Sequence, residues 1–283
     1  MSGILIGPSC AAGEGQSAAQ LALDAARLDL TALEYQCARG VNLPLDEAAR
    51  LGAAARSAGI TPSVHAPYFI NLSSDDEIRI EKNAGYLLAS AQLAEAMGAR
   101  RIVVHCAGRG RRTREEAFAN TLKNVPRLLA ALDENGYRNI SLCIETMGKV
   151  NVIGTLEEVI RICALDERLL PCLDFGHLYA RSGGALKGRD AYHAVFDAVE
   201  NGLGRARCAA AHLHFSRVEY SASGEERHVT LAERTFGPDF TDLAPVLLHR
   251  APNAVLICES AGTQFADART LSAMLSAARR RHE

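Results

Sequence analysis

Eight short apolar segments alternate with eight longer amphipathic segments along this chain, and no other feature restricts the fold more strongly. Several short segments are apolar at consecutive positions, which is typical of strands that are covered on both faces. We predict strands at 4–7, 30–36, 61–65, 101–106, 141–145, 170–174, 209–215 and 255–259. We predict helices at 16–27, 46–58, 76–97, 114–135, 155–164, 190–202, 239–250 and 266–281.

The ends of several predicted helices agree with this alternation. Thr155 precedes Leu-Glu-Glu, which is typical of an N-cap followed by an acidic first turn. Gly59 and Gly98 follow two of the helices, where a left-handed residue commonly ends a helix. Eight strand–helix units predict a parallel (β/α)₈ barrel of the α/β class. The alternative, an open doubly wound sheet, is disfavoured because no G-x-G-x-x-G motif follows the first strand.

Length and composition exclude several classes of protein. The 283 residues, 48% of them hydrophobic, suit one barrel, and no linker divides them, so we expect a single domain over 1–283. No apolar run is long enough to span a membrane, and the first residues lack a signal peptide's basic start. The net charge of −2 gives no global attraction to nucleic acid. Eight cysteines without a C-x-x-C pair argue against a disulfide scaffold and predict a reducing, cytoplasmic compartment.

Histidine or acidic side chains end six consecutive predicted strands, the third to the eighth. They are His65, His105, Glu145, Asp174, His212 and Glu259, with His177 shortly after Asp174 and His214 on the same strand face as His212. A single residue of this kind is more often a core histidine or a helix cap. Six at neighbouring strand ends would each cost several kcal/mol to bury without a shared compensating charge. Imidazole and carboxylate ligands predict a divalent metal site, with zinc expected and manganese or iron as alternatives.

Two further segments carry residues that could bind a metal ion or a phosphate. Glu226 and His228 lie two residues apart after the seventh strand, and residues i and i+2 share a face of an extended segment. A solvated loop is the alternative interpretation. A basic segment follows His105 directly, on the predicted catalytic face, and such side chains supply phosphate affinity without reading sequence. We expect phosphate contacts from Arg109, Arg111, Arg112 and Arg114, unless this segment is only a solvated loop.

These residues resemble the endonuclease IV family of apurinic/apyrimidinic endonucleases, within the wider xylose-isomerase-like barrels, as a divergent member. The resemblance runs from the first strand to Glu259. It implies a (β/α)₈ barrel with three zinc ions and nine ligands, Glu145 bridging two of the ions. The positions that match are His65, His105, Glu145, Asp174, His177, His212, Glu226, His228 and Glu259.

The resemblance also implies an activity. A member of this family would be a zinc-dependent hydrolase that cleaves duplex DNA 5′ to abasic sites during base excision repair, with two to three zinc ions per chain. Glu145 and Glu259 would act as catalytic residues, and Tyr68 matches a family tyrosine that distorts the DNA. We accordingly expect duplex DNA with abasic sites as the partner, no membrane association and a monomeric chain.

Some positions depart from the family pattern and keep other functions open. Glu226 replaces an aspartate, and His212-Leu-His214-Phe replaces H-L-N-D, so whether His214 is a ligand or a substrate-binding residue stays open. The family's basic loop after the second strand is replaced by Cys37-Ala-Arg-Gly-Val-Asn-Leu. A sugar isomerase or epimerase would need only the metal quartet of Glu145, Asp174, His212 and Glu259. A metal-binding barrel without a DNA substrate is the other alternative.

Overall fold

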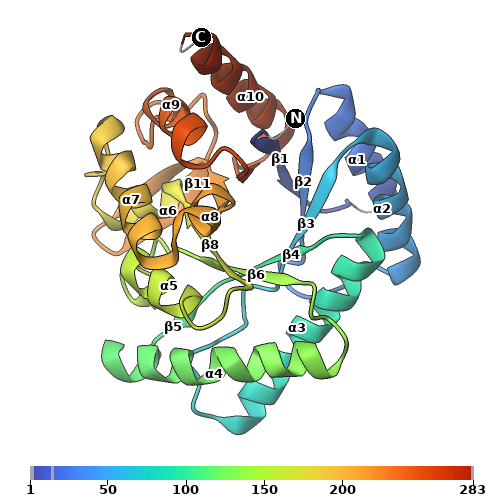
Figure 1. Cartoon of the computed structure of the whole chain (residues 1–283), viewed down its shortest axis with the longest axis vertical. Helices are drawn as coiled ribbons and strands as arrows, with labels where there is room; N and C mark the ends of the chain where they lie inside the picture. The colour runs from blue at the N-terminus through green and yellow to red at the C-terminus, as the bar shows by residue number, and fades with distance from the viewer. Residues whose placement is uncertain (1–2, 14–15, 282–283) are drawn as a thin grey trace.

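The eight predicted barrel strands pair side by side and close into a cylinder. The computed structural model describes residues 3–13 and 16–281. Its parallel strands follow the order β1-β12-β9-β8-β6-β4-β3-β2, and the helices form a ring outside them (Figure 1). The strands are β1 (Leu5–Cys10), β2 (Ala32–Gln36), β3 (Thr61–His65), β4 (Arg101–Val104), β6 (Ser141–Glu145), β8 (Leu169–Asp174), β9 (His212–Phe215) and β12 (Val255–Cys258). The predicted (β/α)₈ barrel is confirmed.

Each predicted helix is present, with ends shifted by a few residues. The helices are α1 (Ala18–Arg27), α2 (Leu45–Ala58), α3 (Glu77–Met97), α4 (Arg114–Glu134), α5 (Leu156–Cys163), α7 (Gly188–Leu203), α9 (Phe240–Arg250) and α10 (Gln264–Arg280). Thr155 caps α5 in a capping box with Glu158. Gly59 and Gly98 end α2 and α3 with φ of 71° and 74°, where a side chain would be strained.

Alternation along the strands divides the buried side chains between two environments. Outward-facing residues pack beneath the helices in the main hydrophobic core. Inside the barrel, small apolar clusters such as Val103, Cys143 and Cys172 are separated from that core. Glu34 and His212 are also completely buried. Polar groups in such a place need partners, because burying them unpaired costs free energy.

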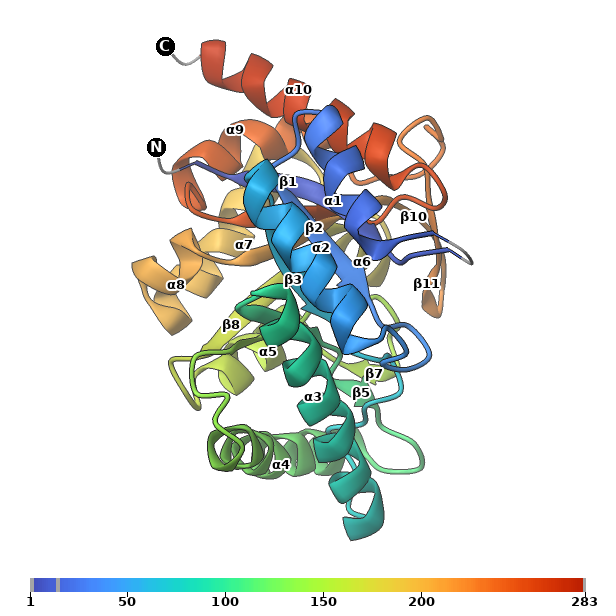
Figure 2. The same cartoon turned by 90° about the vertical axis from the view of Figure 1, so that its right-hand side faces the viewer.

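Several short elements were not predicted, because each is either too brief for a periodic pattern or, in the case of two longer strands, too polar to stand out as an apolar run. They are α6 (Phe175–Arg181), α8 (Arg205–Ala209), the hairpin of β10 (Arg217–Ser221) and β11 (Gly224–Val229), and the pair of β5 (Ala107–Gly108) and β7 (Val152–Ile153). The hairpin and the β5–β7 pair lie on the same side of the barrel (Figure 2). The carboxyl ends of the strands open on this side, so these elements build up the rim of any site there.

Two further expectations concern the chain as a whole. Among the described residues, no helix combines the length and apolarity needed to cross a membrane. All eight cysteines are free thiols, and all except Cys10 are buried. The predicted absence of a disulfide scaffold therefore agrees with the structure.

Candidate metal centre

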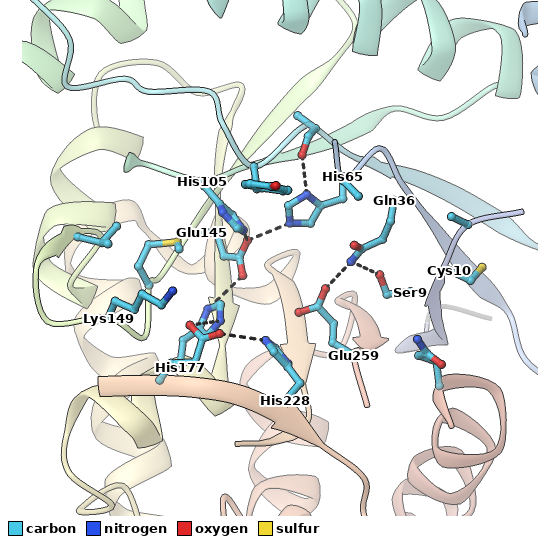
Figure 3. Close-up of a pocket in the computed structure, with 18 of the residues that line it drawn as sticks. Ser9, Cys10, Gln36, His65, His105, Glu145, Lys149, His177, His228 and Glu259 are labelled. Carbon is cyan, nitrogen blue, oxygen red and sulfur yellow. Dashed lines mark hydrogen bonds and ion pairs between the residues drawn. The ribbon is translucent and has the colours of Figure 1, made fainter. Parts of the chain in front are cut away.

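A cavity of about 750 Å³ opens at the carboxyl ends of the barrel strands. Figure 3 shows histidine and glutamate side chains from different strands converging on it. The ligand-type residues that line it are His65, His105, Glu145, His177, Glu225, His228 and Glu259. This is where a (β/α)₈ barrel places its chemistry, and the predicted strand-end residues other than His212 meet here.

The first group is built around one carboxylate oxygen. Oε2 of Glu145, at the end of β6, lies 3.0 Å from Nε2 of His105 and 3.2 Å from Nε2 of His65. Nδ1 of His65 donates a hydrogen bond to the carbonyl of Ala66 at 2.8 Å, so in the neutral ring Nε2 carries the lone pair. A lone pair facing a carboxylate is stable only if a proton or a cation lies between them.

The second group lies at the floor of the cavity. Ligand atoms of Glu145, Asp174, His214 and Glu259 all lie within 4.8 Å of one another. Nδ1 of His214 is 3.3 Å from Oε2 of Glu259 and 3.4 Å from Oε1 of Glu145. Nδ1 of His214, Oε1 of Glu145 and Oδ2 of Asp174 are buried and make no hydrogen bond to the described residues. Unpaired atoms that each offer a lone pair and converge in this way fit a bound cation.

Asp174 serves two purposes at once. Its Oδ1 accepts a hydrogen bond from the backbone N–H of His177 at 2.6 Å and so caps α6, while Oδ2 faces the second group. Helix α6 starts directly after β8 because of this cap. The helix carries His177 over the cavity, which explains how residues three apart can belong to one site.

The third group joins α6 to the β10–β11 hairpin. Nε2 of His177 lies 3.1 Å from Oε2 of Glu225, and Nε2 of His228 lies 3.6 Å from Oε1 of the same residue. Nδ1 of His177 donates to the carbonyl of Thr146 at 2.9 Å, and Nδ1 of His228 is 2.7 Å from Oγ of Ser216. Gly148 permits this approach, because a Cβ there would lie 2.6 Å from Cβ of Glu225.

The electrostatics of the groups also fit a cation. Burial by itself raises the pKa of Glu145, but His105 and His214 hold it well below its usual range. Burial likewise opposes ionisation of Glu259, whose pKa His214 lowers to about 2. The pKa of His214, which burial alone would lower, is raised well above its ordinary value by Cys172 and by the carboxylates around it. Protons on imidazoles and a divalent ion are alternative ways to compensate this buried negative charge.

The structure places His212 deeper in the barrel than the other predicted ligands, where it adjoins Cys172 and His214. Both His212 and His214 point into the barrel from β9, but His214 pairs in register with Asp174 at the strand end, whereas His212 pairs with Cys172 one step deeper. His214 therefore joins the floor of the cavity. His212 instead lies 2.9 Å from Glu34 through Nε2, and burial lowers its pKa to about 4 despite that carboxylate. Residues i and i+2 on one strand face lie nearly 7 Å apart along the strand, so only His214 of the two histidines reaches the cavity floor.

The expectation for Glu226 is also corrected. The hairpin register runs from Glu219–Arg227 to Tyr220–Glu225, so Glu226 is the extra residue of a β-bulge. The bulge breaks the alternation that would have placed Glu226 beside His228. Glu226 is exposed and accepts a hydrogen bond from Ser221, while Glu225 faces the cavity. The sequence contains the Glu-Glu pair but no signal for the bulge.

The predicted phosphate-binding arginines do not line the cavity. Arg112 pairs with Asp75, and Arg114 binds Glu158 at 2.6 Å and the carbonyls of Val150 and Val152. Arg109 donates to Asn151, and Arg111 is exposed to solvent. Arg114 thus stabilises the segment before α5 instead of facing a ligand.

Other residues supply the rim and floor of the cavity. Tyr68 lines the cavity with half of its surface exposed. Lys149, which sequence reasoning missed, extends into the cavity from the segment after β6 (Figure 3). Nε2 of Gln36, also missed, donates to Glu259 at 2.9 Å and is held in turn by Ser9. Gln36 ends β2 and Lys149 lies shortly after the end of β6, and this position at a strand end is the one signal that points to them.

The fold and the position of the cavity define a (β/α)₈ barrel of an enzyme superfamily, with its chemistry at the carboxyl ends of the strands. The chain belongs to the xylose isomerase-like TIM barrel family, whose family model matches residues 22–278.

Two relatives and one solved structure show which members of this family the chain resembles. The chain is 31% identical over 234 residues to the uncharacterized protein MJ0133 of Methanocaldococcus jannaschii, covering 83% of each chain. It is 30% identical to a probable endonuclease 4 of Streptomyces avermitilis, over 77% of this chain and 70% of the relative. The endonuclease IV structure from Thermus thermophilus aligns with a TM-score of 0.73 at 25% identity, covering 96% of this chain and 99% of that one. The predicted resemblance to endonuclease IV is confirmed.

A structure of a D-tagatose 3-epimerase-like protein also aligns, with a TM-score of 0.75 at 16% identity over 99% of this chain and 100% of that one. At this level of identity the likeness concerns the fold alone.

Proposed function

We propose that this protein is a metal-dependent phosphodiester hydrolase that cleaves duplex DNA 5′ to abasic sites and leaves a 3′ hydroxyl. One observation carries the proposal: two further ligand groups flank the floor quartet, one built on His65 and His105 and the other on His177, Glu225 and His228. An enzyme that needs one metal ion has no use for these groups. The similarity to probable endonuclease 4 proteins supports the same assignment.

The three groups are adjacent: Glu145 belongs to the first two, and its Oε1 lies 3.2 Å from Nδ1 of His177 in the third. We assign His65, His105 and Glu145 to one ion. Glu145, Asp174, His214 and Glu259 would hold a second ion, and His177, Glu225 and His228 a third. Bound zinc, or manganese or iron in its place, would lower the pKa of water to near neutrality and offset the charge of a phosphate.

The chain's own residues have distinct tasks around these ions. Glu145 is buried and faces the positions of the first two ions, so its catalytic task would be to hold both ions beside the attacking water. Glu259 is oriented for a similar task, because Gln36 holds its Oε1. Lys149 would bind a phosphate oxygen as a point charge, and the exposed ring of Tyr68 would stack against an unpaired base or sugar.

The proposal is tested with protein purified without chelator. Elemental analysis should find two to three divalent ions per chain, mainly zinc. The loaded protein should cut an oligonucleotide duplex that contains an abasic site, but not the intact duplex, and dialysis against chelator should abolish the cut. Full metal loading without cleavage or salt-dependent DNA binding would overturn the nuclease assignment.

A sugar epimerase is the second candidate, and the floor quartet favours it. Glu145 and Glu259 both approach Nδ1 of His214, at 3.4 and 3.3 Å, at the floor of a cavity whose volume suits a small ligand. A single metal ion per chain, together with epimerisation of a ketose, would support this candidate over the nuclease.

A further inference from the structure

Glu34 is a completely buried carboxylate in the interior of the barrel, below the cavity. It projects from β2, and none of the described lysines or arginines forms an ion pair with it. Oγ of Ser63 donates to its Oε2 at 2.9 Å, and Nε2 of His212 lies 2.9 Å from the same oxygen. Its Oε1 lies 3.0 Å from Nε2 of His214, and neither atom makes a hydrogen bond of regular geometry with a described residue. A buried charge placed in this way requires a reason.

The reason follows from how the other candidate ligands are held. His65, His177 and His228 each have Nδ1 fixed by an oxygen, from Ala66, Thr146 and Ser216 respectively. The opposite nitrogen of each ring faces the carboxylates of a ligand group. Protein metal sites use such contacts to fix the tautomer and orientation of a histidine ligand.

His214 repeats this pattern in reverse. Its Nδ1 faces Glu259 and Glu145, while its Nε2 faces Glu34. Glu34 is therefore to His214 what backbone carbonyls are to His65 and His177, with the difference that it carries a full charge. Ser63 and His212 occupy its second oxygen, which keeps the carboxylate from turning away from His214.

We propose that Glu34 is a positioning residue for the metal ion of the floor quartet, acting through His214; this inference rests on the metal centre of the proposed function. By favouring the tautomer with the proton on Nε2, the charge of Glu34 leaves Nδ1 unprotonated toward Glu145, Asp174 and Glu259. Its charge also makes the imidazole a more basic ligand. His212, in turn, holds Glu34 and is no ligand of this ion.

The test measures metal retention instead of activity. Zinc-loaded protein is titrated with a chelator of known affinity, and zinc released per chain is followed for the wild type, Glu34→Gln and Glu200→Gln. The last is a matched control, because it makes the same change in a carboxylate that pairs with Arg250. Glu34→Gln should weaken retention of one ion by about 10- to 100-fold and leave any other ion unchanged. Glu200→Gln should retain zinc as the wild type does.

A second variant guards against misfolding of Glu34→Gln. Ser63→Ala keeps the carboxylate and removes one donor to it, so it should weaken the same ion by about two- to tenfold. Thermal unfolding of the metal-free variants distinguishes a loss of fold stability from a loss of zinc affinity. A lower melting temperature with wild-type zinc retention in both variants would overturn the inference and leave the proposed function intact. Absence of zinc from the wild type itself would instead overturn the proposed metal centre.

Discussion

The cavity floor and the β10–β11 hairpin offer the same kinds of side chain but hold them differently. On the floor, Glu145, Asp174 and His214 are completely buried, on strands that pair on both sides within a closed barrel. On the hairpin, the side chains of Glu225 and His228 are 15% and 23% exposed. The hairpin has two strands and is tied to the barrel rim by backbone bonds such as Val150 to Ser223 and Glu225 to Gly148.

This difference indicates which part of the centre is rigid and which can adjust. An isolated two-stranded hairpin is barely stable in water, so this one depends on its contacts with α6 and the segment after β6. Regions of this kind open locally at lower free energy than barrel strands. We therefore expect changes on the floor to disturb every ligand group, and changes on the hairpin to disturb one.

The largest effect is expected for Glu145→Gln on the floor. The two carboxylate oxygens of Glu145 face His65 and His105 on one side and His177 and His214 on the other. The substitution should lower metal content by at least one ion per chain and cleavage by roughly 1000-fold, the upper range for loss of one stabilising group in a transition state. Elemental analysis and single-turnover cleavage measure both. Cleavage that stays within tenfold of the wild type would contradict the shared position of Glu145.

On the hairpin, Glu225→Gln should cost less than Glu145→Gln but more than Glu226→Gln. Loss of Glu225 removes the carboxylate between His177 and His228, so one ion should bind about 10- to 100-fold more weakly. Glu226→Gln is the matched control, because Glu226 is exposed at the bulge and should change affinity by less than about twofold. If Glu226→Gln proved the more damaging of the two, the assignment of Glu225 to the centre would be wrong.

The salt dependence of DNA binding distinguishes rim residues that contact phosphate from rim residues that stabilise the fold. Lys149 lines the cavity, and a phosphate contact from it should contribute about 0.9 to the slope of log affinity against log salt. Lys149→Ala should reduce the slope by this amount. Arg114→Ala should instead lower thermal stability with little change in slope, because Arg114 is bound to Glu158. The opposite outcome would restore the phosphate-binding role predicted for Arg114 from the sequence.

The smallest expected effect concerns acid stability of the rim. Burial would raise the pKa of Glu158, but Arg114 and the backbone N–H groups of Gly154 and Thr155 lower it below 4.5. A carboxylate with a lowered pKa stabilises the fold above its unfolded value and loses that contribution as the pH falls through the folded value. Glu158→Gln should therefore reduce the free energy of unfolding by about 1–2 kcal/mol at neutral pH. The difference from the wild type should shrink toward pH 3, as denaturant titrations at each pH would reveal, and a difference that grew with acidity would contradict the sign.

The predictable part of this protein is the part set by periodicity. Apolar runs and helical spacing located the barrel strands, and the rule that chemistry follows their carboxyl ends located His65, Glu145 and Glu259. The choice between His212 and His214 depends on how far β9 extends relative to β8, which alternation alone does not specify. The partners of Arg112 and Arg114 lie more than thirty residues away in the sequence, so the sequence alone does not show that these arginines are paired with acidic side chains.

The bulge at Glu226 also bears on how the hairpin tolerates changes in length. Two glutamates adjoin each other there, and the bulge decides which of them faces His228. A chain that lacked either glutamate would pair without a bulge, and the remaining one would stand two residues before His228 on the same face. Loss of a residue at this place therefore preserves the acid beside the imidazole. The hairpin therefore keeps an acidic ligand even when one of its two adjacent glutamates is deleted.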